Sequence, residues 1–235
     1  MISSRALSPQ KALALTAAAE FAGPFLFGVA VATTIGSEVV QPAAISSGVI
    51  VAALSSAIAW NLITWYLGWP SSTSHALIGG LIGAVTVAAG FDTVEVAGLN
   101  KVLVALFLSP VLGLIVGYLM LKALYFLSRG ASPKVNTVFR RGQLVTSLAL
   151  ALSHGTNDAQ KTMGIIAMAM VTTGYTAEFH VPWWVITMSA GAIALGTATG
   201  GWRLIKTLGG KFFKIRPIHA FGSQMSSAAI ILGAA

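Results

Sequence analysis

The sequence predicts an all-α membrane protein, a polytopic bundle of transmembrane helices. Of its 235 residues, 56% are hydrophobic and only 9% are charged, whereas a soluble globular domain carries about 25% charged residues. The mean hydropathy is +0.83. A single soluble core of this length cannot bury so much apolar surface, but a lipid bilayer can accommodate it. The sequence has no cysteine, which excludes a disulfide framework and a thiolate metal site.

Seven apolar stretches are candidates for membrane-spanning helices, each of which needs about 20 apolar residues to cross the hydrocarbon core. In order, they cover residues 12–35, 43–67, 76–91, 102–127, 143–173, 183–205 and 218–235. The third stretch is short and rich in glycine, and the fifth is long and carries polar residues in its middle. We therefore expect a multi-pass protein of the cell membrane.

The loop charges predict how these helices are oriented. The 14 Lys and Arg residues outnumber the six acidic residues and gather in short runs, such as residues 129–142 and 203–216. Cytoplasmic loops of membrane proteins carry such an excess of Lys and Arg, so we expect these loops on the inside. The loops near Glu38, Asp92 and Glu178 are acidic or nearly uncharged and should lie outside. Basic runs placed between apolar stretches do not indicate a nucleic-acid partner.

The first polar motif, Pro70 to His75, contains four hydroxyl residues in a row, Ser71 to Ser74. Proline fixes φ and lacks an N–H, so it can begin a helix. A helix N-terminus has a partial positive charge and free N–H groups, which suit an anion. The alternative is an ordinary capped helix start at the membrane surface.

The second polar motif, residues 153–164, lies about ten residues inside an apolar stretch, so Asp158 should lie deep in the membrane. A charge there costs about 2.5–3.5 kcal/mol on insertion scales and marks a functional candidate. Gly155 could let the helix unwind and free carbonyl groups for a cation, while Asp158 supplies the anionic oxygen that Na⁺ or H⁺ needs. The alternative is an Asp158–Lys161 pair that neutralises itself.

Glu20 is the acidic residue of the first apolar stretch. It is either a ligand for a proton or cation, or a partner for a buried polar group. An enzyme is disfavoured. His154 and Asp158 share a helix face, but zinc needs about three protein ligands. Ser74 beside His75 does not make a catalytic dyad without a fold to align them. We expect no enzymatic activity and no cofactor.

A weak internal repeat is also visible. Residues 54–58 are similar to residues 225–229, and Ala22-Gly23 is similar to Ala190-Gly191, in the same order. The repeat predicts a second proline and hydroxyl motif beyond the last residue, and a second Asn-Asp motif upstream of the first residue. We therefore expect the chain to lack one polar motif at each end.

These motifs resemble those of the inorganic phosphate transporter (PiT) family of phosphate permeases. The family has a Gly-x-Asn-Asp motif in each half, which Gly155 to Asp158 matches. It also has a Pro-x-Ser-Thr-Thr-His motif in each half, which Pro70 to His75 matches with Ser74 in place of threonine. Residues 5–9 look like the stretch that follows the first Asn-Asp motif. The resemblance covers essentially the whole chain.

The resemblance implies two inverted repeats, with discontinuous or re-entrant helices at the polar motifs and with phosphate and sodium between the repeats. Residues 1–128 would form most of the first repeat, residues 129–142 a basic cytoplasmic loop, and residues 143–235 part of the second repeat. Phosphate binding falls to Ser72, Thr73, Ser74, Thr156, Asn157 and Asp158. Cation coupling falls to Gly155, Asn157 and Asp158, with Glu20 as a further candidate, and no other metal is expected.

The function that the resemblance implies is secondary active transport of inorganic phosphate, coupled to Na⁺ or H⁺. We expect a homodimer or a complementing partner chain. One alternative is a permease for sulfate or another tetrahedral oxyanion, although a protonated phosphate can donate a hydrogen bond to Asp158. Another is a fragment that transports only with a partner chain.

Overall fold

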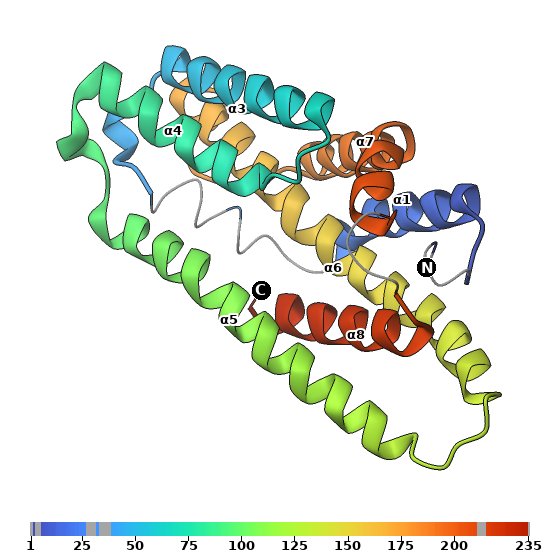
Figure 1. Cartoon of the computed structure of the whole chain (residues 1–235). Coiled ribbons are helices and arrows are strands. Elements are labelled where there is room, and N and C mark those ends of the chain that lie inside the picture. The colour runs from blue at the N-terminus through green and yellow to red at the C-terminus, as the bar shows by residue number, and fades with distance from the viewer. Residues whose placement is uncertain (1, 3–5, 27–31, 33–38, 211–214, 235) are drawn as a thin grey trace. The chain divides into compact units, whose positions relative to one another are not determined.

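The structure is a computed structural model of the chain and describes residues 2, 6–26, 32, 39–210 and 215–234 (Figure 1). Within these residues the chain is all-α, apart from an isolated antiparallel bridge between Val40 and Val94. The elements are α1 (Pro9–Leu26), η1 (Pro42–Ala44), α3 (Ser47–Leu67), α4 (Thr73–Ala89), η2 (Phe91–Thr93), α5 (Val96–Leu127), α6 (Val135–Thr172), α7 (Trp183–Gly210) and α8 (Pro217–Ala234).

Each described α-helix overlaps one of the seven predicted apolar stretches. Residues 27–31, 33–35 and 235 of those stretches lie outside the described residues. The basic loop expected over residues 129–142 is shorter than predicted because α6 begins at Val135. Arg140 and Arg141 therefore lie on the first turns of a helix. This start is missed by a search for apolar residues, since four of the first eight positions of α6 are polar or charged (Asn136, Thr137, Arg140 and Arg141).

Helix lengths bear on membrane insertion. By length and composition, α3 and α5 can cross a membrane, and α4 is apolar but has only 17 residues. The 38 residues of α6 make a helix about 57 Å long at 1.5 Å per residue, longer than a hydrocarbon core of about 30 Å. If α6 crossed a membrane, part of it would extend beyond that core, which fits its basic first turns.

The chain divides into two compact units. Unit 1 comprises residues 1–27, 106–157 and 190–235, and unit 2 comprises residues 28–105 and 158–189. The helices α5, α6 and α7 each contribute to both units. The first polar motif, residues 70–75, therefore belongs to unit 2. The second motif belongs to both units, because unit 1 ends at Asn157 and unit 2 resumes at Asp158.

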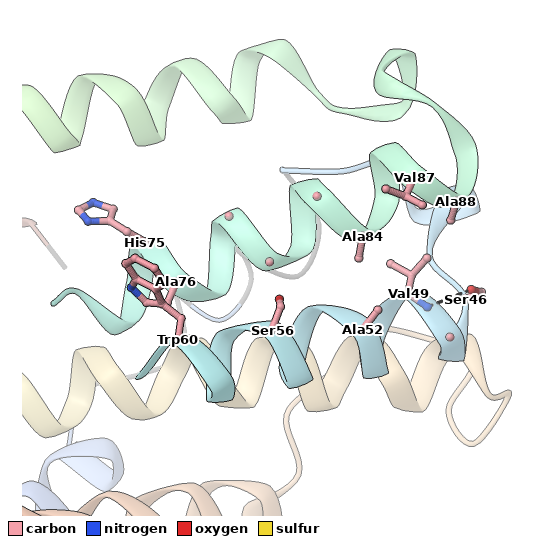
Figure 2. Close-up of a pocket in the computed structure, with 14 residues that line it drawn as sticks. Ser46, Val49, Ala52, Ser56, Trp60, His75, Ala76, Ala84, Val87 and Ala88 are labelled. Carbon is pink, nitrogen blue, oxygen red and sulfur yellow. Dashed lines mark hydrogen bonds between the residues drawn. The ribbon is translucent and has the colours of Figure 1, made fainter. Parts of the chain in front are cut away.

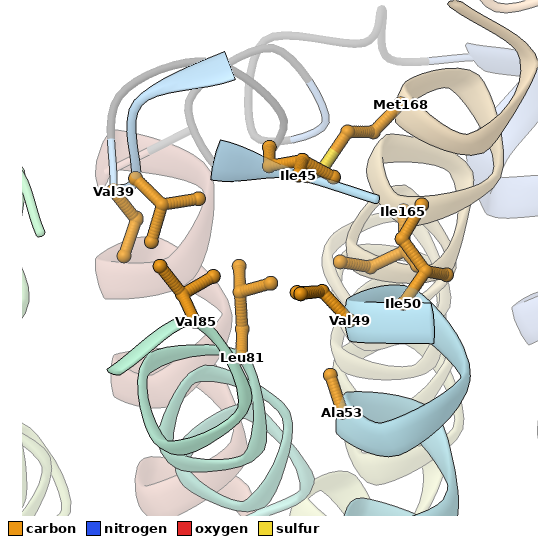
Figure 3. Close-up of a cluster of buried hydrophobic side chains, with 10 residues drawn as sticks. Val39, Ile45, Val49, Ile50, Ala53, Leu81, Val85, Ile165 and Met168 are labelled. Atoms are coloured by element: carbon orange, nitrogen blue, oxygen red, sulfur yellow. The ribbon is translucent and has the colours of Figure 1, made fainter. Parts of the chain in front are cut away.

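In unit 2, α3 and α4 form a packed helical hairpin. Gly68 ends α3 with φ 70°, a left-handed conformation that suits glycine. Gly80 allows the helices to approach, because a Cβ at this position would lie 2.6 Å from the Ala53 carbonyl oxygen and from Ser56 Oγ. Side chains of both helices contribute to a buried apolar cluster (Figure 3). The cluster consists of Val39, Val40, Ile45, Val49, Ile50, Ala53, Leu81, Val85, Ile165 and Met168.

In unit 1, the start of α8 packs against α5 and α6. Leu124, Phe139 and Ile218 form a buried cluster, and the ring centres of Phe139 and Phe221 lie 5.6 Å apart. The buried Gln143 side chain donates to the Pro217 carbonyl oxygen over 2.9 Å. This bond satisfies a buried amide that would otherwise cost about 1–3 kcal/mol, and it fixes where α8 begins.

Candidate functional site

The first polar motif forms the turn between α3 and α4. Ser72 has an extended backbone and is the N-cap of α4, and its Oγ accepts from His75 N over 3.3 Å. Ser71 Oγ lies 2.8 Å from Thr64 Oγ1 on α3, which ties the turn to the preceding helix. Thr73 opens the first turn of α4, where backbone N–H groups lack an acceptor within the helix. A helix does start within this motif, as the sequence predicts, but it begins at Thr73, three residues after Pro70, rather than at the proline.

The hydroxyl groups of this turn are accessible. Ser71, Ser72 and Thr73 are exposed, and Ser74 is half-buried. Free N–H groups, exposed hydroxyls and the positive end of the α4 dipole therefore occur together at one point. Chemically, this is a set of donors that an oxyanion can use.

A hollow of about 1000 Å³ runs between α3 and α4, with His75 and Trp60 at one end and Ser46 at the other (Figure 2). Most of its remaining lining consists of alanine, glycine and valine side chains. Such a lining supplies few hydrogen-bond donors. The candidate anion site is therefore the start of α4, which shares His75 and Ala76 with the hollow.

The second polar motif lies on an unbroken helix, because α6 continues from Val135 to Thr172. The prediction that the helix unwinds at Gly155 is thus wrong for this structure. Gly155 instead permits close contact with α1, since a Cβ there would lie 2.4 Å from Glu20 Cα. Gly23 does the same from the α1 side, where a Cβ would lie 2.3 Å from the Leu152 carbonyl oxygen. Small residues allow helices in membranes to approach in this way.

Glu20 lies beside this crossing, and each of its two carboxylate oxygens has a polar partner. Its Oε1 lies 3.0 Å from His154 Nδ1, and its Oε2 accepts from Thr197 Oγ1 over 2.5 Å. Only 5% of the Glu20 side chain is exposed, against 52% for His154. Burial of a carboxylate is costly unless it is paired and hydrogen-bonded. Thr197 supplies a hydrogen bond, and the contact with His154 is also an ion pair when the imidazole is protonated.

Asp158 forms the ion pair that the sequence offered as an alternative. Its Oδ1 lies 2.5 Å from Lys161 Nζ, and the two side chains are 23% and 13% exposed. The pair reduces the cost of placing a carboxylate in a partly buried position. It also means that a cation bound at Asp158 would compete with the Lys161 ammonium group.

The remaining residues of the second motif have local contacts. Thr156 is buried and donates to the Leu152 carbonyl oxygen over 2.8 Å, so its hydroxyl hydrogen is already used. Asn157 is half-buried. A joint role of the two polar motifs in one site stays a prediction.

Sequence reasoning missed two partners of Glu20. His154 and Thr197 are 134 and 177 residues away from it in the chain. The available signal was polarity, because Thr197 lies among small and apolar residues of a predicted span. Nothing in the sequence says which polar residues of separate helices meet.

The profile of the phosphate transporter family matches residues 1–235. A "probable low-affinity inorganic phosphate transporter" of Bacillus subtilis is 45% identical over 99% of this chain and 71% of the relative. A protein of the same description from Rhizobium meliloti is 41% identical over 100% of this chain and 71% of the relative. A solved structure described as "the sodium-dependent phosphate transporter" is similar with a TM-score of 0.90 and 23% identity, over 99% of this chain and 77% of that one.

Proposed function

Because the chain belongs to the phosphate transporter family, we propose that it is a secondary active transporter of inorganic phosphate, coupled to Na⁺ or H⁺. Membership makes it a membrane protein, and its relatives are transporters rather than enzymes. We place it in the cell membrane as a multi-pass protein, with the described α-helices as its spans or re-entrant segments. Two inverted repeats, residues 1–128 and 143–235, complete this proposal.

The observation that carries the proposal is the start of α4. Phosphate is mostly a dianion near neutral pH, and a helix N-terminus is equivalent to about half a positive charge. Exposed hydroxyls at Ser72 and Thr73 add donors beside the free N–H groups of the first turn. In the proposed site, Ser72, Thr73 and Ser74 donate to phosphate oxygens.

The cation sites are proposed at the carboxylates. A dianion in the membrane needs compensating charge, and the candidates are Glu20, Asp158 and the neighbouring Asn157. Asp158 would exchange its Lys161 partner for Na⁺ or H⁺ during the cycle. The released ammonium group of Lys161 could then interact with the phosphate. Gly155 contributes through its close packing against Glu20 rather than through freed carbonyls.

Sulfate is the main rival substrate because it is also a tetrahedral oxyanion that hydroxyl and N–H donors can bind. Phosphate differs in that its protonated form donates a hydrogen bond, which a carboxylate such as Asp158 accepts. We also propose that the chain works as a homodimer or with a complementing chain, because a second polypeptide would supply further residues of the site.

The test is uptake of radiolabelled phosphate into proteoliposomes containing the purified chain, with an inward Na⁺ gradient, an inward H⁺ gradient, or neither. Sulfate in excess serves as competitor. We expect gradient-driven phosphate accumulation that sulfate does not suppress. Absence of uptake under all three conditions, with the folded protein in the bilayer, would overturn transport by this chain alone.

A matched pair of variants tests the proposed anion site. Ser72 caps α4 and Ser46 caps α3, each through a 3.3 Å bond from the N–H three residues later. Aspartate is as good an N-cap as serine, so both Ser72→Asp and Ser46→Asp should fold. Only Ser72→Asp places a negative charge where phosphate is proposed, so only this variant should lose uptake, by at least tenfold. Equal uptake by the two variants contradicts the site.

A further inference from the structure

The end of α5 carries a surface feature that phosphate transport does not use. A hollow of about 590 Å³, here called the α5 hollow, is lined by Tyr118, Lys122, Tyr125, Phe126 and Arg129 together with apolar neighbours. Lys122 Nζ lies 5.8 Å from the centre of the Tyr118 ring, and Arg129 Cζ lies 5.2 Å from that of Phe126. These separations fall within the range of cation–π contacts, about 6 Å. Two cations are thus held over aromatic rings.

Unit 1 is strongly basic and has no acidic residue available to pair with Lys122 and Arg129. By sequence, unit 1 contains twelve of the 14 Lys and Arg residues and only one of the six acidic residues, Glu20. Glu20 is buried and already bonded to His154 and Thr197. A negative group that binds at the α5 hollow must therefore come from outside unit 1.

The surroundings of the α5 hollow indicate what that group is. The most apolar window of α5 has no buried residue, and Leu114, Leu119 and Leu127 are 75%, 57% and 77% exposed. In a membrane protein such a helix face contacts lipid. The α5 hollow lies at the end of this face, where Lys122 and Arg129 can extend toward the polar boundary.

The expected orientation supports the same conclusion. The α5 hollow adjoins the basic stretch of residues 129–142, which the loop charges place on the cytoplasmic side. The cytoplasmic leaflet is the one that carries anionic lipids. A free phosphate ion would satisfy the two cations only, whereas a phospholipid would also cover the apolar face beside them.

We propose that the α5 hollow binds the phosphodiester headgroup of an anionic phospholipid. Lys122 and Arg129 donate to its phosphate oxygens, Tyr118 and Phe126 contact its apolar part, and its acyl chains lie along α5. The inference depends on the chain being a membrane protein and does not depend on the substrate or coupling ion of transport.

The test is native mass spectrometry of the purified full chain in detergent, titrated with phosphatidylglycerol or phosphatidylcholine. We expect phosphatidylglycerol to bind at least tenfold more tightly. A basic residue near an anionic lipid surface is worth about fivefold in affinity, so Lys122→Gln/Arg129→Gln should weaken phosphatidylglycerol binding roughly 25-fold. Excess inorganic phosphate should not displace the lipid.

The matched control is Lys134→Gln/Arg141→Gln, which removes the same charge from exposed positions outside the α5 hollow. An equal loss of lipid binding in the control would overturn the site in favour of general charge attraction. Displacement of the lipid by inorganic phosphate would show that the α5 hollow binds a free anion rather than a lipid headgroup. Equal affinity for phosphatidylglycerol and phosphatidylcholine would refute an anionic lipid site. If the first variant does not fold, Lys122→Arg/Arg129→Lys keeps both charges and must retain the preference for phosphatidylglycerol.

Discussion

His154 Nδ1 lies 3.0 Å from Glu20 Oε1, which joins an exposed imidazole on α6 to a buried carboxylate on α1. Thr197 on α7 donates to the other carboxylate oxygen. Three helices of unit 1 therefore meet at one acidic side chain, the only one that this unit contains. The arrangement connects the second polar motif to a carboxylate that precedes it by more than a hundred residues.

The first prediction concerns the charge of Glu20. Glu20→Gln keeps the size of the side chain and can still accept from Thr197, so we expect the variant to fold. If the negative charge takes part in cation coupling, gradient-driven phosphate uptake should fall at least tenfold. The control is Glu178→Gln, at an exposed loop position, which should transport normally. Normal uptake by Glu20→Gln would restrict Glu20 to a structural role.

The second prediction concerns the bond from His154. His154→Ala removes one partner of a buried carboxylate, and a buried polar group left unsatisfied costs about 1–3 kcal/mol. We expect a lower melting temperature in detergent. In the Glu20→Gln background the same substitution should cost less, because the carboxylate charge is gone. Equal losses in both backgrounds would mean that the two side chains do not interact, and a double-mutant cycle of melting data measures this directly.

The third prediction separates close packing from helix propensity at Gly155. Alanine favours a helix over glycine by about 1 kcal/mol, but a Cβ at Gly155 would lie 2.4 Å from the Glu20 backbone. Overpacking of this kind costs about 1–3 kcal/mol, so Gly155→Ala should lower the melting temperature. Gly191→Ala on α7 has nothing within 4 Å of the added Cβ and should be neutral or stabilising. A stabilised Gly155→Ala protein would refute the crossing of α1 and α6.

The fourth prediction compares two adjacent glycines of α4. A Cβ at Gly80 would lie 2.6 Å from the Ala53 carbonyl oxygen, whereas a Cβ at Gly79 meets nothing within 4 Å. Helix propensity changes equally at the two positions, so the difference between the variants reports the packing of α3 on α4. We expect Gly80→Ala to melt below Gly79→Ala. Identical melting temperatures would mean that the hairpin is less closely packed than described.

The helices of this fold could be predicted from sequence because hydrophobicity is a direct property of each stretch. The start of α6 could not, since residues 135–142 are helical but half of them are polar or charged. The helix start within the first polar motif follows from local chemistry, although Ser72 rather than Pro70 is the residue that caps it. Local chemistry and apolar length therefore account for the elements that the sequence predicted.

The site was only partly predictable for a physical reason. Glu20 and Asp158 stand out as acidic residues in apolar surroundings, and Lys161 lies within one helical turn of Asp158. The partners His154 and Thr197 reach Glu20 only through helix packing, which the sequence pattern does not encode. The sequence predicts unwinding at Gly155 because the backbone of Glu20, which explains the glycine, comes from another helix.

The last prediction concerns the Asp158–Lys161 pair, whose Oδ1 and Nζ atoms lie 2.5 Å apart. A pair that only neutralises itself and a carboxylate that binds the coupling cation predict different results. Removal of one partner leaves a partly buried charge unpaired, which is destabilising, so Asp158→Asn alone cannot separate the two explanations. The double variant Asp158→Asn/Lys161→Gln can, because it removes both charges and leaves neither unpaired.

If Asp158 holds the cation, the double variant should fold like the unmodified chain but lose the response of phosphate uptake to the Na⁺ or H⁺ gradient. The measurement is initial uptake in proteoliposomes at a series of cation concentrations, with melting temperature as the folding check. The matched control is Lys161→Gln alone, which keeps the carboxylate and frees it from its ammonium partner. Because a cation then no longer competes with the Lys161 ammonium group at Asp158, half-maximal uptake in Lys161→Gln should need less cation. Unchanged cation dependence in both variants would leave the pair with a structural role only.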